Sequence, residues 1–422
     1  MSYYNIYVIF SLICALLSIF GDKINVGSTD YLVFFLFFIV SIVLFIKAKK
    51  FVVPKKYSIL LLLYIIFITI NAYVSPYTPG LPYVILGTLI TIMPFLVFIV
   101  SYNYNFTIDN IYKFIDVWIY FIIGLCVVAY IETPFLSSNS FYNGTILKIS
   151  IIKQGFFSSL CNQGVILSLY RYSSSHNLKY RKIAYFFSIC SILTIQLKVI
   201  FGLLVIWVLY FGYISKIKKH MIIIPILMVL SFGILAIKNI PPLSNKVEKY
   251  LLLYGGKDSY ENVARPALYY QSVHIANDFF PLGSGQGTFG SVPANMLYNQ
   301  IYYDYNLNLI HGLGESGENY KMDTHWSGII GENGYLGSLL YFLLFFYSLS
   351  SLKKINNSPN KNATKFLILT VYFITFIESI SLCIPGRMAF MFIYAGILGL
   401  ISRSINNDCT NILSKTIISD KK

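Results

Sequence analysis

The sequence has few charged residues for its length. Asp, Glu, Lys and Arg make up only 12% of its 422 residues, whereas 56% are hydrophobic and the mean hydropathy is +0.67. A soluble globular chain carries about 25% charged residues. The composition therefore excludes a two- or three-domain soluble protein and predicts an all-α integral membrane protein, with lipid as its main solvent.

Acidic residues are scarcer than basic ones, with 17 Asp and Glu against 32 Lys and Arg and a formal net charge of +15. In a soluble protein this excess would suggest nucleic acid as a partner. Here the lysines stand in short clusters between apolar runs, as the positive-inside rule describes for membrane proteins. We therefore expect no nucleic-acid binding and a location in a membrane.

Cysteines are few, and their spacing indicates neither a metal site nor a disulfide framework. Five of the six lie in or beside apolar runs and one lies in the C-terminal tail: Cys14, Cys126, Cys161, Cys190, Cys383 and Cys409. The first residues carry no positive charge, and no small-residue cleavage site follows Phe20. We expect the first apolar run to be a retained helix, with a cleaved signal peptide as the alternative.

Apolar runs long enough to cross a bilayer predict about twelve transmembrane helices. The strong runs are 4–20, 31–46, 57–74, 81–102, 111–131, 221–237, 328–350, 366–382 and 388–402. The run 155–170 is less certain because it contains Asn162 and Gln163. The predicted division is nine helices in 1–237, a large periplasmic loop in 238–326, three helices in 327–402 and a cytoplasmic tail in 403–422.

One apolar stretch, residues 183–215, would be about 50 Å long as a single helix, which exceeds one upright crossing. Basic residues flank it on both sides, namely Arg171, Lys179, Arg181 and Lys182 before it and Lys216, Lys218 and Lys219 after it. Both ends should therefore be cytoplasmic, so we expect two crossings with a turn near residues 196–202. This puts Lys198 at the outer surface and leaves both chain termini in the cytoplasm.

The loop 238–326 contains most of the residues suited to chemistry, although a passive outer loop is the alternative. Arg265 precedes an apolar stretch and then the run P-L-G-S-G-Q-G-T-F at 281–289. Farther on, Asp323, His325 and Trp326 lead into G-E-N-G-Y-L-G at 331–337, which opens an apolar run. The pattern G-x-G-x-x-G within 285–290 lacks the strand that a dinucleotide site needs, so we interpret these glycines as turns.

This order of an Arg, a "P-x-G-x-G-x-G-x-F" turn, a polar His or Asp and an "E-x-G-x-x-G" helix entry resembles the O-antigen polymerase and O-antigen ligase superfamily. Gly155, Phe156, Phe157 and Asn162 extend the resemblance, as does the segment 193–202, where the family often has Ser-Arg and Lys198 stands nearby. The resemblance implies a membrane-embedded glycosyltransferase similar to the GT-C type. Such an enzyme uses undecaprenyl-diphosphate-linked oligosaccharide and membrane lipid outside the cytoplasm.

Transfer from a diphosphate carrier requires a cation for the leaving group and a base for the acceptor hydroxyl. Arg265 is the expected cation because guanidinium grips phosphate oxygens bidentately, and Lys198 and Arg387 are further candidates. Lipid headgroup anchoring is the alternative for each. The base candidates are Asp323 and His325, with a cap of the entering helix as the alternative for Asp323. The ligase-type His is expected nine positions before Glu332, where this chain has Asp323, and this difference favours the polymerase branch.

Other residues are expected to support the site or to bind the glycan. We expect Glu332 to be structural support, and Glu378, inside an apolar run, to face the bundle and pair with Lys198 or Arg387. Aromatic rings such as Tyr269 and Trp326 suit glycan stacking, with scaffold or interface roles as the alternative.

Metal-dependent transfer is not expected, because no Asp-x-Asp pair occurs in the chain. We therefore predict transfer without a metal or cofactor, with inversion at the anomeric centre because a single base suffices for direct displacement.

The leading functional prediction is an O-antigen or related surface-polysaccharide polymerase that acts in lipopolysaccharide biosynthesis. It would move the growing glycan onto the next lipid-linked repeat unit, and a chain-length regulator is a candidate partner. The alternatives are an O-antigen ligase, which moves glycan onto lipid A core, and a flippase for lipid-linked oligosaccharide. A flippase of this kind should have a structural repeat that relates the two halves of its chain.

Overall fold

The computed structural model describes residues 3–20, 29–47, 51–104, 106–136, 147, 149, 152, 154–214, 263–316, 320–347, 349–350, 360–383 and 387–405. Every regular element within these ranges is a helix, and none of these residues forms a strand. The all-α class is thus confirmed for the described ranges. The predicted helix 221–237 and the segments 238–262 and 406–422 lie outside them.

Within these described ranges, five helices are long and apolar enough to cross a membrane. They are α3 (Lys55–Val74), α4 (Leu81–Asn103), α5 (Ile108–Leu136), α15 (His325–Phe345) and the helix Met388–Ile405, which contains α17 (Met388–Met391) and the π-helical η3 (Phe392–Gly396). Three shorter helices are also apolar, namely α1 (Tyr3–Phe20), α2 (Thr29–Lys47) and α8 (Leu197–Tyr213). Such helices indicate a protein embedded in a membrane.

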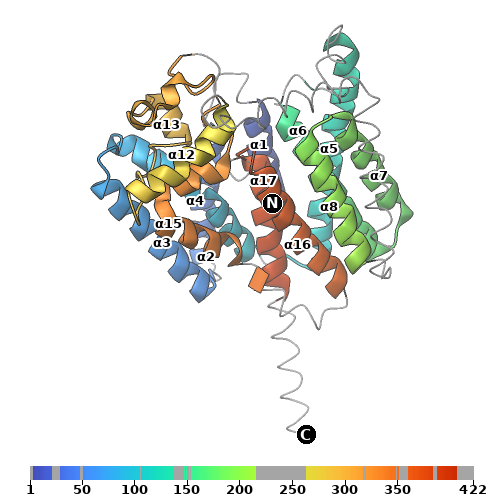
Figure 1. Ribbon diagram of the computed structural model, residues 1–422. Helices are drawn as coiled ribbons and strands as arrows, with labels where there is room; N and C mark the ends of the chain where they lie inside the picture. The colour runs from blue at the N-terminus through green and yellow to red at the C-terminus, as the bar shows by residue number, and fades with distance from the viewer. Residues whose placement is uncertain are drawn as a thin grey trace.

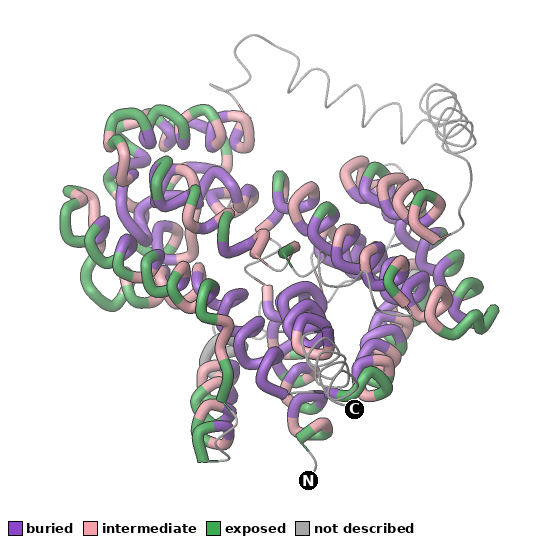
Figure 2. The backbone as a smooth tube through the Cα atoms, turned by 90° about the horizontal axis from the view of Figure 1, so that it is seen from below, coloured by how far each residue is buried: buried purple, intermediate pink, exposed green. Residues whose placement is uncertain are grey.

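The outward face of α3 is as apolar as its inward face. Large hydrophobic side chains with a helical spacing of three to four residues are exposed there: Ile59, Leu62, Ile66, Ile70 and Tyr73. The opposite face buries Tyr57, Leu61, Tyr64 and Ile68. Exposed residues follow the periphery of the helices in Figure 2. A helix that is apolar on all sides at a molecular surface is suited to lipid rather than water.

The helices form two groups with a central layer between them (Figure 1). One group contains α3, α4, α15 and α12 (Ala264–Asp278), and α15 packs against both α3 and α12. The other contains α5, α6 (Gln154–Ser175), α7 (Leu178–Leu193) and α8. Helix α16 (Lys361–Glu378) packs against α6 and α8, and α17 packs against α1.

The apolar stretch 183–215 is broken into two helices, as predicted. Helix α7 ends at Leu193 and α8 begins at Leu197, so the break lies at the N-terminal edge of the expected turn. Ile195 within it has a φ of 48°. A β-branched residue rarely adopts a positive φ, so the surrounding structure must hold this turn in place. The break puts Lys198 in the first turn of α8.

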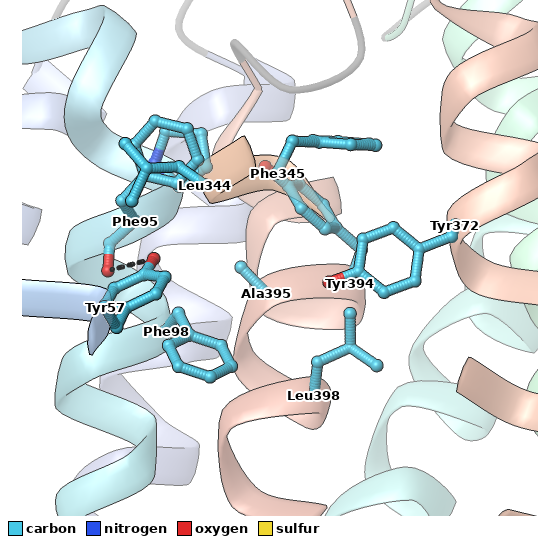
Figure 3. Close-up of a pocket in the computed structure, with 10 residues that line it drawn as sticks. Tyr57, Phe95, Phe98, Leu344, Phe345, Tyr372, Tyr394, Ala395 and Leu398 are labelled. Atoms are coloured by element: carbon cyan, nitrogen blue, oxygen red, sulfur yellow. Dashed lines mark hydrogen bonds between the residues drawn. The ribbon is translucent and has the colours of Figure 1, made fainter. Parts of the chain in front are cut away.

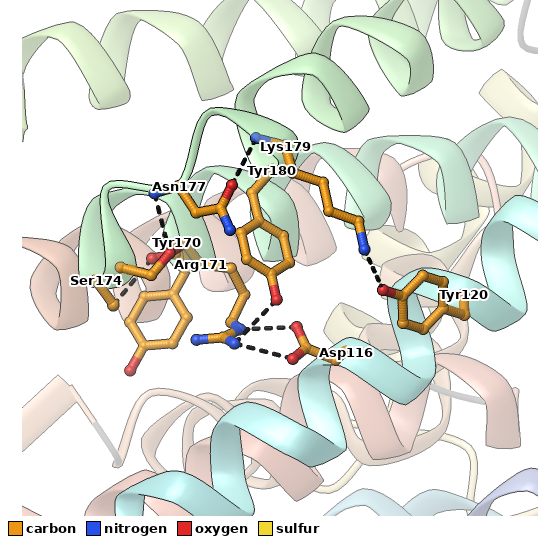
Figure 4. A network of polar contacts seen from close by, with 9 residues as sticks. Asp116, Tyr120, Tyr170, Arg171, Ser174, Asn177, Lys179 and Tyr180 are labelled. Carbon is orange, nitrogen blue, oxygen red and sulfur yellow. Dashed lines mark hydrogen bonds and ion pairs between the residues drawn. The ribbon is translucent and has the colours of Figure 1, made fainter.

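Arg171 connects three helices of the second group (Figure 4). Its Nε and Nη2 donate to the two carboxylate oxygens of Asp116 on α5, at 2.7 and 2.9 Å, and Nη2 also donates to the Tyr180 hydroxyl on α7 at 3.0 Å. The guanidinium lies 4.5 Å from the ring centroid of Tyr112. A bidentate pair of this kind fixes both distance and orientation, so it sets how α5, α6 and α7 meet.

Residues 263–316 have a hydrophobic core of their own. Besides α12, they form α13 (Val292–Leu297), α14 (Ile301–Asp304) and the 3₁₀ helix η1 (Leu307–Leu309). Their buried side chains gather in one cluster that includes Leu268, Ile275, Phe289, Tyr302 and Leu313. A polar helix such as α12 is stabilised by burying one side in such a cluster. This small unit holds Arg265 and the glycine-rich turn against α15.

Candidate functional site

The glycine-rich turn 281–289 docks on a kink in α15. Gly334 interrupts that helix with φ 56° and ψ −160°, which leaves backbone groups without their helical partners. The turn satisfies them: Ser284 N donates to Gly331 O at 2.9 Å, Gly285 N to Glu332 O at 3.0 Å, and Leu336 N donates to Pro281 O at 3.3 Å. The two glycine motifs are therefore halves of one backbone interface.

Close approach at this interface requires glycine on both sides. A Cβ on Gly283 would collide with the backbone nitrogen of Gly334, and a Cβ on Gly334 would lie 2.5 Å from the nitrogen of Gly283. Both residues also have positive φ, of 83° and 56°. Any side chain here would separate the turn from the helix.

The Glu332 carboxylate organises the rest of the turn. One oxygen accepts hydrogen bonds from the backbone amides of Gly287 and Phe289, both at 3.0 Å, and from the Ser291 hydroxyl at 2.6 Å. The other oxygen accepts from Gln286 Nε2 at 3.0 Å. The side chain is 3% exposed. A buried carboxylate with this many donors holds the groups around it in place as a structural clamp.

Arg265 and Asp323 form an ion pair at the edge of this unit. Arg265, in the first turn of α12, donates from Nη2 to Asp323 Oδ2 at 2.9 Å. Asp323 comes two residues before α15, and the two side chains are 32% and 21% exposed. Two of the three predicted catalytic residues therefore meet directly, and both remain accessible to a ligand.

Tyr269 lies one turn after Arg265 on α12, so the two side chains share a face of that helix. Its hydroxyl donates to Ile380 O at 2.8 Å, just beyond the end of α16. Burial raises the pKa of this phenol, which stays protonated and able to donate. Tyr269 thus connects the unit carrying Arg265 to the segment 379–383.

His325 makes its side-chain contacts with groups other than Arg265 and Asp323. Its Nε2 lies 3.0 Å from the Tyr341 hydroxyl, and its Nδ1 lies 3.4 Å from Cys383 Sγ. Its backbone N donates to Ser379 O at 3.2 Å. Both ring nitrogens are thus engaged with other groups, which leaves Asp323 as the better placed of the two base candidates.

Lys198 on α8 and Glu378 at the end of α16 complete a charged cluster with Arg265 and Asp323. Lys198, in the first turn of α8, is partly buried and lies within electrostatic range of Glu378, Arg265 and Asp323. Glu378 is fully buried, and its Oε1 accepts from Asn162 Nδ2 at 2.8 Å, while the same amide donates to Val199 O at 3.0 Å. Of the two partners expected for Glu378, the structure brings Lys198 near.

Close packing of α8 depends on a further glycine. A Cβ on Gly202 would lie 3.0 Å from Asn162 Nδ2 and 3.5 Å from Glu378 Oε1. Gly202 therefore lets α8 approach the buried polar group on α6 and α16.

Arg387 and Trp326 occupy different surroundings. The Arg387 guanidinium lies 4.7 Å from the ring centroid of Phe156, at the start of α6. Trp326 is 4% exposed, donates from Nε1 to Phe376 O at 3.0 Å, and contacts the rings of Phe345 and Phe376. This burial favours a packing role for Trp326 over the predicted contact with glycan.

Two pockets lie beside these elements. One, of about 260 Å³, is lined by aromatic and aliphatic side chains, including Tyr57, whose hydroxyl donates to Phe95 O at 3.3 Å (Figure 3). The other, of about 520 Å³, lies between α4, α15 and residues 290–293, and its walls include His325, Glu332 and Cys383. Of these two pockets, the second has both a carboxyl group and an imidazole among its lining residues.

Sequence reasoning missed several residues of this region. Gln286 and Ser291 donate to Glu332, and Tyr341 and Cys383 hold the His325 ring. Gln286 stands inside a recognised motif, so it could have been singled out. Tyr341 and Cys383 lie in or beside apolar runs, and nothing in their local sequence signals a contact with His325.

The cluster combines two cations, Arg265 and Lys198, with the acids Asp323 and Glu378, where the apolar helices α8 and α15 begin. Such a site can bind an anion and accept a proton. Within the described ranges, no three His, Cys, Asp or Glu residues are grouped to hold a metal ion. The chain matches no known protein-family model and no curated protein.

Proposed function

We propose that the protein is a membrane-embedded glycosyltransferase that moves a glycan from a polyprenyl diphosphate to an acceptor hydroxyl, as an O-antigen or related surface-polysaccharide polymerase. The observation that carries this proposal is the Arg265–Asp323 pair, with Lys198 within electrostatic reach. A double cation beside an available carboxylate suits a diphosphate leaving group and a hydroxyl nucleophile. The order of motifs, which resembles the polymerase and ligase superfamily, supports the same reading.

In the proposed reaction, the acceptor oxygen attacks the anomeric carbon while the bond from that carbon to the diphosphate oxygen breaks. The hydroxyl proton passes to Asp323, and the diphosphate leaves with the bonding electrons. Arg265 and Lys198 stabilise its negative charge. Attack and departure on opposite faces invert the anomeric centre.

Donor binding would also prepare the base. Arg265 donates to Asp323 through one nitrogen, and a guanidinium carries five N–H donors. A diphosphate is a stronger partner for this fork than one carboxylate, because it offers more charge and more acceptor oxygens. Its arrival weakens the hold of Arg265 on Asp323, which then becomes free to accept the hydroxyl proton.

Glu332 acts here as a positioning residue. Its carboxylate orders the segment 286–291. The backbone carbonyl groups of Gly331 and Glu332 accept hydrogen bonds from the glycine-rich turn. Because this turn follows α12 directly, its docking on α15 sets the distance between Arg265 and Asp323. Precise placement of such groups contributes strongly to catalysis.

The proposal includes a topology of about twelve spans in the bacterial inner membrane, with residues 238–326 in the periplasm and both termini in the cytoplasm. Arg265, Asp323 and Lys198 would then face the periplasm, where lipid-linked repeat units are joined. A chain-length regulator would contact the enzyme on that side.

The polysaccharide of a deletion strain tests the proposed function. Loss of a polymerase should leave lipopolysaccharide capped with single repeat units. Bare core with accumulated lipid-linked polymer would indicate a ligase instead, and an unchanged ladder would contradict both. Complementation with Arg265→Ala at normal protein level separates an enzyme from a flippase, because a flippase needs no leaving-group cation.

A further inference from the structure

Cys383 and His325 form a thiol–imidazole pair outside the charged cluster. Sγ of Cys383 lies 3.4 Å from His325 Nδ1, within hydrogen-bond range for sulfur. The second ring nitrogen, Nε2, lies 3.0 Å from the Tyr341 hydroxyl. With Nε2–H donating to Tyr341, Nδ1 has its lone pair directed at the thiol.

Among the cysteines that the structure describes, this thiol is the accessible one. Cys383 is partly exposed, whereas the other cysteines within the described ranges, Cys14, Cys126, Cys161 and Cys190, are buried. Cys383 and His325 both line the pocket of about 520 Å³ between α4 and α15. A small molecule that enters this pocket therefore meets the thiol and its acceptor together.

We propose that Cys383 is a covalent modification site at which small, uncharged, soft electrophiles add to the thiol with His325 as the proton acceptor. Thiols react as thiolates, and a neighbouring base supplies the thiolate as the bond forms. The walls contributed by α4 and the segment 290–293 include Ile90, Pro94, Val292 and Pro293. These apolar groups favour an uncharged reagent.

The step balances without a redox partner. The sulfur of Cys383 bonds to the β-carbon of an activated alkene, and the alkene π electrons move to the adjacent carbonyl as an enolate. The thiol proton passes to His325 Nδ1 and from there to the enolate carbon. The product is a thioether, and no group leaves.

The titratable groups around the pair lie on or next to α15, except Tyr394 in η3, which interacts electrostatically with Cys383. Tyr341 contacts the imidazole, Glu332 lines the same pocket, and Asp323 precedes His325 by two residues in its pair with Arg265. The pocket residues from α4 and from 290–293 carry no ionisable side chain. His325 is the base that lies within hydrogen-bond range of the thiol.

The test measures alkylation by N-ethylmaleimide in the full-length protein in lipid nanodiscs, with modified peptides quantified by mass spectrometry. At about pH 6, well below the ordinary thiol pKa of about 8.5, a free thiol such as glutathione reacts slowly. Cys383 should react about tenfold faster than glutathione at this pH, since base assistance contributes at least this much. Equal or slower reaction of Cys383 would overturn the proposal.

Two variants and a control isolate the imidazole. His325→Gln should slow alkylation of Cys383 about tenfold, and Tyr341→Phe, which keeps the ring but removes the Nε2 partner, should slow it less. The control His274→Gln removes an exposed histidine on α12 and should leave the rate unchanged. If His325→Gln does not fold, the Tyr341→Phe variant serves as the test. An unchanged rate of Cys383 alkylation in that variant contradicts the proposal. The rate of labelling does not depend on glycan transfer. This test of Cys383 is therefore independent of the proposed function.

Discussion

Arg265 and Asp323 are 58 positions apart in the sequence, and their side chains meet at 2.9 Å. Arg265 lies in the first turn of α12 and Asp323 precedes α15, so the pair forms only when the glycine-rich turn between them docks on the kink of α15. The proposed chemistry therefore depends on an interface that contains no catalytic group. This dependence gives the following predictions.

Arg265→Lys should lower the rate of glycan transfer about tenfold, and Arg265→Ala about 100-fold. Lysine keeps the charge but loses the planar fork that can hold Asp323 and a phosphate together. The measurement is the rate of product formation by purified protein with a lipid-linked repeat unit. Equal rates for Arg265→Lys and wild type would show that only charge matters at this position.

Glu332→Gln should reduce stability by about 1–3 kcal/mol, because its amide NH₂ would face donors that now point at a carboxylate. Glu332→Ala should cost more, since it leaves the amides of Gly287 and Phe289 without their acceptor. Thermal unfolding in detergent measures both. Glu315→Gln is the matched control, because Glu315 is exposed and accepts one bond from Tyr303. A similar shift in both variants would contradict the clamp role.

Arg171→Lys should destabilise the protein by about 1–3 kcal/mol while the activity of the folded fraction stays unchanged. The lysine cannot reproduce the two parallel bonds to Asp116. Thermal unfolding and transfer rate, measured on the same preparation, separate the two effects. Arg181→Lys is the control, because Arg181 is exposed and makes a longer contact with Tyr172, at 5.6 Å. A loss of activity without loss of stability would place Arg171 in the chemistry instead.

Leu309→Cys and Leu178→Cys should report opposite sides of the membrane. Leu309 is 77% exposed in the unit carrying Arg265, and Leu178 is 53% exposed at the start of α7. A membrane-impermeant maleimide should label position 309 in intact spheroplasts and position 178 only after permeabilisation. Labelling of both from the same side would contradict the proposed topology.

Chelation with EDTA should leave the transfer rate unchanged, because two cationic side chains rather than a divalent ion would stabilise the leaving group. Addition of Mg²⁺ or Mn²⁺ to the treated protein is the control. A loss of rate with EDTA that either ion restores would contradict the predicted metal independence.

Much of the helical framework could be predicted from the sequence, because long apolar runs have few other solutions in lipid. Basic clusters lie at both ends of 183–215, which predicted that both ends are on the same side of the membrane and that the stretch must turn once. This placed the break before Lys198 to within a few residues. The kink at Gly334 was not foreseen. The kink depends on the docking of residues 281–285 against α15. A hydropathy pattern gives no information about such a long-range contact.

The candidate site was predictable only where a motif named its residues. Arg265, Asp323 and Glu332 stand in recognisable runs, whereas the approach of Lys198 to Glu378 depends on how α8 and α16 pack around Asn162. The contacts of His325 with Tyr341 and Cys383 come from segments whose local pattern is that of ordinary membrane helices. Long-range packing of this kind leaves no local signal.

The most direct test of the central claim is the transfer rate of Asp323→Asn in purified protein, with donor and acceptor repeat units linked to polyprenyl diphosphate. The asparagine keeps the size of the side chain and can still accept a bond from Arg265, but it cannot take the acceptor proton. The rate of forming the lipid-linked dimer should fall at least about 100-fold while the protein remains folded. A rate within a few-fold of wild type would show that Asp323 is not the base.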